Sequence, residues 1–178
     1  MLTAIVLANA QEKQEFARRA PEEAARTLAF LVSAAVQGLV RDAVLIGAES
    51  AALRYVADYA GCTLVTEPEP AAALAAALAA ARGEHVFLLK AGYAAEPPLI
   101  DEIRDFLEFG RGRVGACGLV REAPGNFAQR LLPRTSPLAG LVAPHEKSRA
   151  APARNLEDMA RRLRPAVTLN ARARRLIY

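Results

Sequence analysis

The sequence predicts one α/β domain with a mostly parallel sheet flanked by helices. Short apolar runs alternate with segments of helical spacing along residues 1–120, as they do in repeated βαβ units. The 178 residues are enough for one domain with a real core. We therefore treat residues 1–178 as a single domain, with a βαβ half over 1–120 and a less regular segment over 121–178.

The predicted strands are short apolar runs that end at polar residues or glycine. They cover residues 2–8, 43–46, 62–65, 86–89 and 114–120. The predicted helices combine helical spacing of apolar residues with high helix propensity. They cover residues 21–36, 51–60, 71–82 and 98–109. Pro21 is expected in the first turn of its helix, and Gly61 and Gly83 are expected to end theirs.

The pattern becomes less regular beyond Arg121. Residues 133–152 contain several prolines, which predict a broken, loop-like segment. His145 in this loop is either catalytic beside Glu146 or incidental, whereas His85 and Cys117 are expected to be structural residues of strands. Three further elements are predicted: a short amphipathic segment over 127–132, a helix over 156–163 and a last strand over 167–169.

The net charge of +4 is unevenly distributed along the chain. Residues 146–178 contain nine Lys or Arg against three Asp or Glu. Such an Arg-rich segment either is a solvated surface or docks on a protein partner or an anionic membrane surface. We expect no nucleic-acid partner, because aromatic residues for base stacking make up only 6% of the chain.

Targeting and redox features of the sequence indicate a cytoplasmic protein. No apolar run reaches the length of a transmembrane helix. The first ten residues lack the basic region and cleavage pattern of a signal peptide. The two cysteines, Cys62 and Cys117, form no disulfide framework or metal-binding pattern, which favours a reducing compartment.

The segment from Glu84 to Pro98 is the most informative stretch for function. It reads as a buried strand that delivers Lys90, Ala91 and Gly92 to a loop at its carboxyl end, where ligands of α/β folds bind. A site for Mg²⁺ or Mn²⁺ would need oxygen ligands at this position. Lysine and glycine offer none, so we expect no metal site and no cofactor here.

Four segments together resemble the family-two glycosyltransferases of GT-A fold. Residues 8–12, Ala-Asn-Ala-Gln-Glu, stand where that family has Pro-x-x-Asn and an acidic residue after its first strand. Residues 44–50 stand where a strand ends in Asp-Gly-Gly-Ser, and residues 87–92 where one ends in Asp-x-Asp or His-Ala-Asp. Residues 156–163 resemble the family's Glu-Asp helix. The order of elements fits over nearly the whole chain, and the motifs fit in part.

The resemblance implies a compact GT-A-like (nucleotide-diphospho-sugar transferase-like) domain. Residues 1–120 would be its nucleotide-binding half, and residues 121–178 its acceptor side with the basic C-terminal segment. The position of the family's base-binding aspartate is Gly47, which has no acceptor, so Glu49 or Ser50 would substitute; alternatively, Ser50 only caps the next helix. The nucleotide-binding residues implied in this way are Ala8, Asn9, Glu12, Glu49, Ser50, Lys90 and Gly92.

Lys90 admits two interpretations. Its ammonium group either replaces the metal ion and meets a phosphate directly, or it is a solvated loop residue of a decayed site.

The Glu157-Asp158 pair is the best-preserved motif. The resemblance makes Asp158 the candidate general base with Glu157 as its neighbour. The alternative is that Asn155 caps the helix and both acids merely favour its positive end.

The expected function is therefore that of a glycosyltransferase-like protein that binds a nucleotide-sugar and is either metal-independent or catalytically inactive, a pseudoenzyme. One alternative is a nucleotidyltransferase of the molybdenum-cofactor type, although the first loop lacks that family's glycine-rich, basic character. The other is a non-catalytic module that binds a partner or a membrane surface through the Arg-rich segment.

Overall fold

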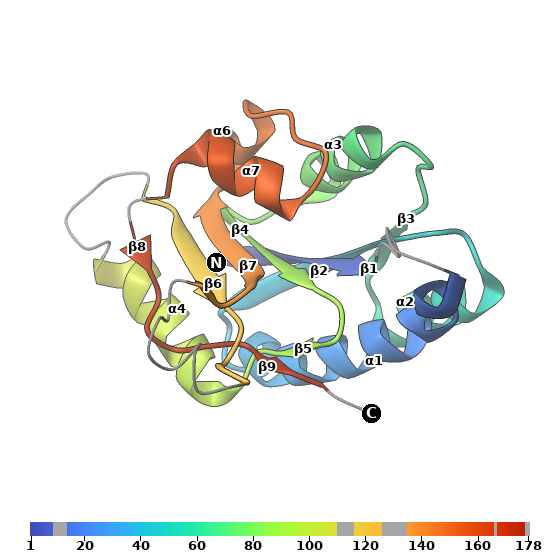
Figure 1. Cartoon of the computed structure of the whole chain (residues 1–178), viewed down its shortest axis with the longest axis horizontal. Coiled ribbons are helices and arrows are strands. Elements are labelled where there is room, and N and C mark those ends of the chain that lie inside the picture. Colours follow the sequence, from blue (N-terminus) through green and yellow to red (C-terminus); the bar gives the residue numbers. More distant parts are fainter. Residues whose placement is uncertain (9–13, 110–115, 126–134, 166, 177–178) are drawn as a thin grey trace.

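The computed structural model describes residues 1–8, 14–109, 116–125, 135–165 and 167–176, with side chains from residue 19 onward in the second range. These residues form three layers, in which a central sheet lies between two layers of helices (Figure 1). The predicted α/β class with a mostly parallel sheet is confirmed. The amphipathic segment predicted over 127–132 lies outside the described residues.

The central sheet contains seven strands among the described residues, in the order β3-β2-β1-β4-β7-β6-β8. Only β7 of these runs antiparallel to its neighbours, β4 and β6. The other paired strands are parallel, so their carboxyl ends meet at one edge of the sheet. The bounds are β1 Leu2–Ala8, β2 Val40–Gly47, β3 Thr63–Val65, β4 His85–Lys90, β6 Gly118–Arg121, β7 Leu138–Pro144 and β8 Val167–Thr168.

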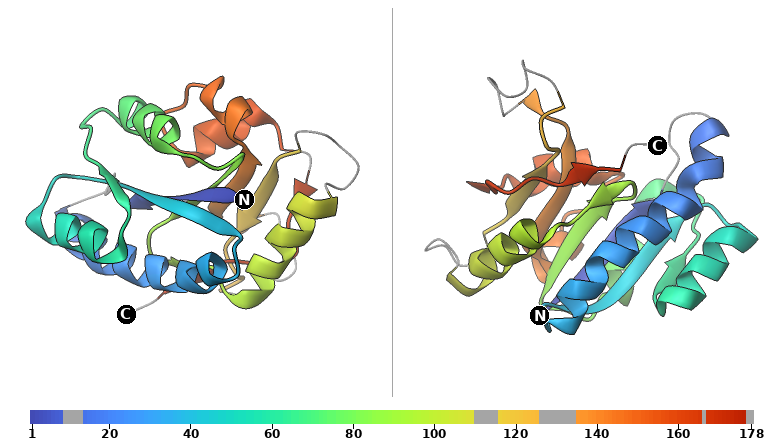
Figure 2. Two further views of the ribbon diagram at one scale, coloured as in Figure 1. Left: turned by 180° about the vertical axis from the view of Figure 1, so that it is seen from behind. Right: turned by 90° about the horizontal axis from the view of Figure 1, so that it is seen from below.

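Helices cover both faces of this sheet (Figures 1 and 2). One layer holds α1 (Gln14–Val36), α2 (Ala51–Ala60) and α4 (Pro97–Phe109), and the other holds α3, α6 and α7. The latter three span Pro70–Ala80, His145–Arg149 and Leu156–Leu163. A small antiparallel sheet joins β5 (Tyr93–Ala94) to β9 (Arg174–Arg175). Within the described part of the chain, no helix is both long and apolar enough to cross a membrane.

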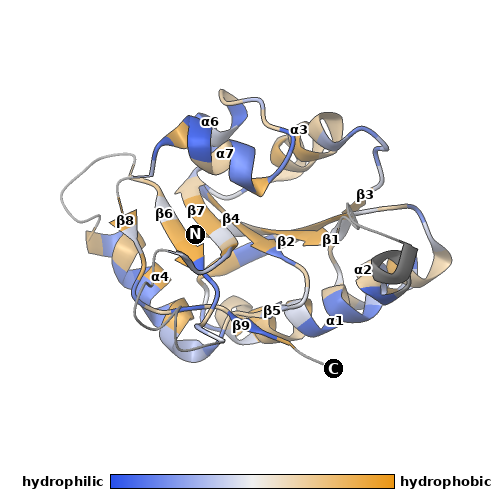
Figure 3. Ribbon diagram, viewed as in Figure 1, coloured by the Kyte–Doolittle hydropathy of each residue, from blue (hydrophilic) through white to orange (hydrophobic). Residues whose placement is uncertain are grey.

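Strand β4 contributes to both hydrophobic cores. Side chains alternate between the two faces of a strand. Phe87 and Leu89 therefore pack in the core with α1, α2 and α4, while Val86 and Leu88 pack in the core with α3 and α7. All four are buried. The hydropathy colouring shows β4 and its neighbours β1 and β7 as apolar strands between more polar helices (Figure 3).

Several predicted elements are confirmed with the same bounds, namely β1, α2 and α7. Their ends follow from local chemistry. Ser50 accepts a hydrogen bond from the Leu53 N–H at the start of α2, and Gly61 ends that helix with a φ of +65°. A left-handed residue at a helix end favours glycine because a Cβ is disfavoured there.

Two expectations about helix ends are wrong. Helix α1 begins at Gln14, so Pro21 lies inside the helix and not in its first turn. Helix α3 ends at Ala80 with Ala81 as its cap, so Gly83 does not end it. Gly83 instead packs closely against β1. A Cβ at this position would lie 2.5 Å from the Thr3 backbone nitrogen, so the packing requires glycine.

The proline-containing segment 133–152 is not the predicted loop. It contains β7, which lies between β4 and β6, and α6 directly after it. His145 consequently belongs to a helix, where its Nε2 lies 2.6 Å from the Leu78 carbonyl oxygen. Cys117 is buried as expected but precedes β6 and does not lie within a strand.

Candidate functional site

A cavity of about 880 Å³ opens at the carboxyl ends of β1, β2, β4 and β6. Its walls come from the last residues of these strands, from the starts of α3 and α7, and from α1 and β9. This is the edge of the sheet at which α/β folds bind ligands, because the loops that follow parallel strands gather there. The cavity therefore has both the size and the position of a ligand site.

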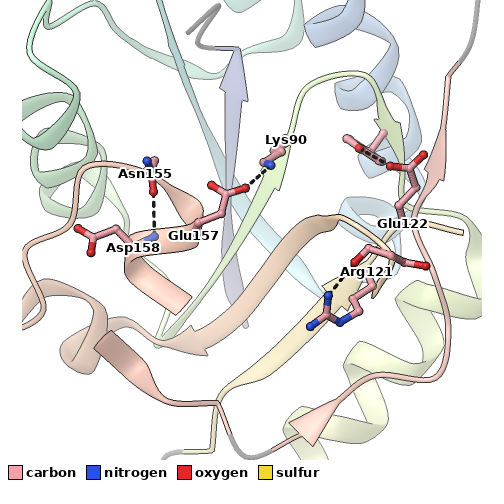
Figure 4. Close-up of polar contacts among 8 residues, drawn as sticks. Lys90, Arg121, Glu122, Asn155, Glu157 and Asp158 are labelled. Carbon is pink, nitrogen blue, oxygen red and sulfur yellow. Dashed lines mark hydrogen bonds and ion pairs between the residues drawn. The ribbon is translucent and has the colours of Figure 1, made fainter. Parts of the chain in front are cut away.

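Lys90 and Glu157 meet inside this cavity (Figure 4). The Lys90 Nζ lies 2.5 Å from Glu157 Oε1, and both side chains are partly exposed. Lys90 is the last residue of β4, and alternation along the strand puts it on the face that α7 covers. Glu157 lies in the first turn of α7. A partly exposed pair of this kind contributes little stability, about 0–1 kcal/mol, so its geometry matters more for ligand binding.

Asp158 faces away from Lys90, toward the start of its own helix (Figure 4). Its Oδ2 accepts a hydrogen bond from the Arg154 backbone N–H at 3.2 Å and lies 3.2 Å from the Arg162 Nε. These contacts, with a further contribution from Arg161, hold the pKa of Asp158 below its usual range. The Asp158 N–H in turn donates to the Asn155 side chain at 2.8 Å. Asp158 is absent from the described cavity walls, whereas Glu157 is part of them.

The loop after β4 is fixed by buried hydrogen bonds. The Thr27 hydroxyl on α1 accepts from the Gly92 N–H and donates to the Tyr93 carbonyl, each at 3.0 Å. From the other side, the Leu176 N–H donates to the Gly92 carbonyl at 2.8 Å. Gly92 has a φ of +84°, and a Cβ there would lie 3.3 Å from the Glu23 carboxyl carbon. The backbone conformation and the close carboxylate therefore both favour glycine.

Tyr93, the first residue of β5, links this segment to the end of β6. Its hydroxyl donates to Glu122 Oε2 at 2.8 Å. Burial, together with this hydrogen bond to a carboxylate, raises the pKa of Tyr93, so the phenol stays protonated over the physiological pH range. Tyr93 lines the cavity as a buried, anchored side chain.

Cations outnumber carboxylates on the described cavity walls. Burial raises the pKa of Glu23, and the nearby Arg175 and Arg19 oppose this shift. Arg175 reaches the cavity because β9 pairs with β5. The cavity-lining charges are Glu23 and Glu157 on the acidic side, and Lys90, Arg121, Arg154, Arg161 and Arg175 on the basic side. The site therefore suits an anionic ligand.

The structure brings only part of the predicted site together. Of the residues that the resemblance implies, Ala8, Lys90, Gly92 and Glu157 line the cavity. Glu49 and Ser50 do not line it. Glu49 pairs with Arg54 at 2.5 Å, and Ser50 caps α2. Asn9 and Glu12 lie outside the described residues.

Gly47 packs closely against α2. A Cβ at Gly47 would collide with the Leu53 side chain of α2. An aspartate at this position, as in the family that the sequence resembles, would displace a buried leucine.

Several charged cavity residues were missed by the sequence analysis, among them Glu23, Arg121 and Arg175. Arg121 directly follows the strand predicted over 114–120, so its place at a strand end is the one available signal. Glu23 and Arg175 come from a helix and a C-terminal strand that pack beside the loop after β4. No local pattern in the sequence indicates that packing.

The residues at the end of β4 do not fit the metal site that the fold family implies. The Lys90 ammonium group would repel a cation, and Gly92 provides no ligand. Among the residues with described side chains, no cluster of three or more His, Cys, Asp or Glu could hold a metal ion.

No model of a known protein family matches this sequence, and no curated protein matches it. Solved structures do match its fold. Glucosyl-3-phosphoglycerate synthase from Mycobacterium tuberculosis, solved with Mg²⁺ and uridine diphosphate, aligns with a TM-score of 0.61 at 16% identity, covering 100% of this chain and 72% of that chain.

Two further solved structures share the fold. The bifunctional IspDF from Campylobacter jejuni has a TM-score of 0.60 at 13% identity, covering 96% of this chain and 49% of that one. Staphylococcus aureus TarS 1-349 has a TM-score of 0.59 at 11% identity, covering 98% and 60%. This chain thus spans about half of IspDF and less than two thirds of that TarS chain. The likeness defines the fold as GT-A-like, the fold of nucleotide-diphospho-sugar transferases.

Replacing Thr27 tests whether its hydroxyl fixes the loop that carries the site. Thr27→Val leaves the Gly92 N–H and the Tyr93 carbonyl without this partner, which should lower the free energy of unfolding by roughly 2–4 kcal/mol. Thr27→Ser keeps the hydroxyl and should lose about 1 kcal/mol through the missing methyl group. Urea denaturation measures both; equal stability of the two variants would contradict this role.

Proposed function

We propose that this protein binds the diphosphate of a nucleoside-diphosphate sugar in the cavity, with Lys90 supplying the positive charge. The observation that carries the proposal is the position of Lys90: it ends β4, lines the cavity and points its ammonium group at a cavity carboxylate. The GT-A-like fold and the excess of cavity cations support it. The cavity volume of about 880 Å³ is within the range of small-molecule sites.

Binding would exchange one partner of Lys90 for another. Lysine binds phosphate as a compact point charge and needs no fixed fork geometry. The ion pair with Glu157 is partly exposed and therefore weak enough to be replaced by a more highly charged diphosphate. Gly92 and the buried hydrogen bonds of Thr27 keep the backbone next to Lys90 in place during this exchange.

The exchange would also free Glu157 for proton transfer. In sugar transfer, the acceptor oxygen forms a bond to the anomeric carbon while the bond from that carbon to the phosphate oxygen breaks. Glu157 would take the proton of the acceptor hydroxyl, and Lys90 would stabilise the departing diphosphate. The resemblance assigns the base to Asp158, but the cavity geometry supports Glu157, with Asp158 positioning the start of α7.

The two alternatives differ from this proposal in their ligands. A nucleotidyltransferase would consume a nucleoside triphosphate, and a partner-binding module would bind no nucleotide. The Arg-rich C-terminal segment, which would carry partner or membrane binding, is partly used within the domain: Arg174 contacts Glu96 at 2.6 Å and Arg175 lines the cavity. These contacts support the nucleotide-sugar proposal over a free docking segment.

Lys90→Met tests metal-free diphosphate binding. In the presence of EDTA, uridine, guanosine, cytidine and thymidine nucleotide-sugars are screened by thermal shift, and the best ligand is titrated by calorimetry. Losing one charge-assisted contact should weaken its binding at least about tenfold. Lys147→Met, which removes an exposed lysine of α6 outside the described cavity walls, should leave the affinity unchanged.

Three results would contradict the proposal. They are binding that requires Mn²⁺, equal affinity in the Lys90→Met variant, and no shift with any nucleotide-sugar. A separate assay with cytidine triphosphate distinguishes the nucleotidyltransferase alternative. Only that activity would release pyrophosphate.

Paired substitutions separate the roles of the two acids. Glu157→Gln should lower the release of nucleoside diphosphate from the bound donor at least about 100-fold, the typical contribution of a general base. Asp158→Asn should keep most of that activity. Because the pKa of Asp158 is lowered in the folded state, the variant should be less stable at neutral pH, and the difference should shrink as the pH falls through that lowered pKa. The reverse pattern of activities would make Asp158 the base.

A further inference from the structure

Arg121 ends β6 at the same edge of the sheet at which Lys90 ends β4, and one strand, β7, lies between them. Strand β7 separates β4 from β6, and Leu89 of β4 and Val120 of β6 both pair with Gly140. Lys90 and Arg121 therefore follow residues at the same level of the sheet. Neighbouring strands lie about 4.8 Å apart, so the two backbones are separated by about 10 Å.

The guanidinium of Arg121 is held in place but incompletely bonded. Its Nη1 donates to the Ser136 carbonyl at 2.7 Å, at the approach to β7. Its Nε is buried and has no hydrogen-bond partner in the described part of the chain. A buried donor without a partner is costly, and such groups in native proteins usually have a ligand or water to satisfy them.

The neighbouring carboxylates are directed elsewhere. Glu122 points to the other side of β6, where it accepts the hydrogen bond of Tyr93 (Figure 4). Glu157 contacts Lys90, and Glu23 lies against Gly92 and interacts with Arg175. Arg121 thus adds positive charge to the cavity on the side of β6 without an acidic partner among these three residues.

We propose that Arg121 is the centre of a second anion site, which binds a carboxylate or monophosphate group distinct from the diphosphate at Lys90. Resting on the proposed function, this inference makes the sugar acceptor an acidic molecule. A planar guanidinium matches either anion through parallel N–H donors. Ser136 and Glu157 hold the two cationic groups toward different partners, so we assign each group its own anion.

The test is calorimetric titration of inorganic phosphate, and separately of malonate, into the protein saturated with uridine diphosphate in EDTA. The parent should bind at least one of these anions without displacing the nucleotide. Arg121→Met should weaken that binding at least about tenfold and change the affinity for uridine diphosphate less than about twofold. Arg54→Met, a change to a partly exposed arginine of α2 that pairs with Glu49, should alter neither affinity.

The arms of this experiment separate the two proposals. Anion binding that depends on Arg121 in a protein that binds no nucleotide would overturn the proposed function and leave the second site standing. Phosphate and malonate that compete with the nucleotide, or that bind equally well to Arg121→Met, would overturn the second site.

If Arg121→Met does not fold, Arg121→Lys is the second variant. It keeps the charge but loses the planar fork of donors, and it should bind the anion at least about threefold more weakly; unchanged binding would overturn the proposal. The anion that binds more tightly identifies the acidic group.

Discussion

The burial of β4 on both faces is the constraint on which the site depends. Its apolar side chains fill two cores, and its backbone pairs with β1 on one side and β7 on the other. A strand fixed in this way cannot slip by one residue without exchanging its two faces. The position of Lys90 at the strand end is therefore determined by the core, and the hydrogen bonds of Thr27 continue that order into Gly92 and Tyr93.

The sequence predicts the first half of the fold well because its signals are local. Continuous apolar runs define β1 and β4, and a serine and a glycine define the ends of α2. The second half of the fold is harder to predict from the sequence. The prolines of residues 133–152 indicate a loop more strongly than the apolar residues of β7, Leu138–Pro144, indicate a strand. That strand tolerates proline where the chain leaves the sheet at Pro144. It pairs with β4 and β6, and its side chains pack in both cores, so its place depends on long-range contacts.

The residues of the candidate site also divide into those with a local sequence signal and those placed by long-range packing. Strand ends are predictable, so Ala8, Lys90 and Gly92 were expected where the cavity lies. The contact of Lys90 with Glu157 joins residues 67 positions apart, and no local pattern encodes it. Which acid of the Glu-Asp pair faces the cavity depends likewise on how α7 packs over the sheet. The fold and the charges together describe a GT-A-like domain whose ligand would be held by side-chain cations.

The most direct test of this account is a double-mutant cycle on Lys90 and Glu157, read out as the affinity for uridine diphosphate in EDTA. If Glu157 competes with the diphosphate for Lys90, Glu157→Gln alone should tighten binding, by up to about fivefold for a partly exposed ion pair. The same change in the Lys90→Met background should have little effect. Equal effects of Glu157→Gln in both backgrounds would show that Lys90 does not exchange Glu157 for phosphate, and would contradict the central claim.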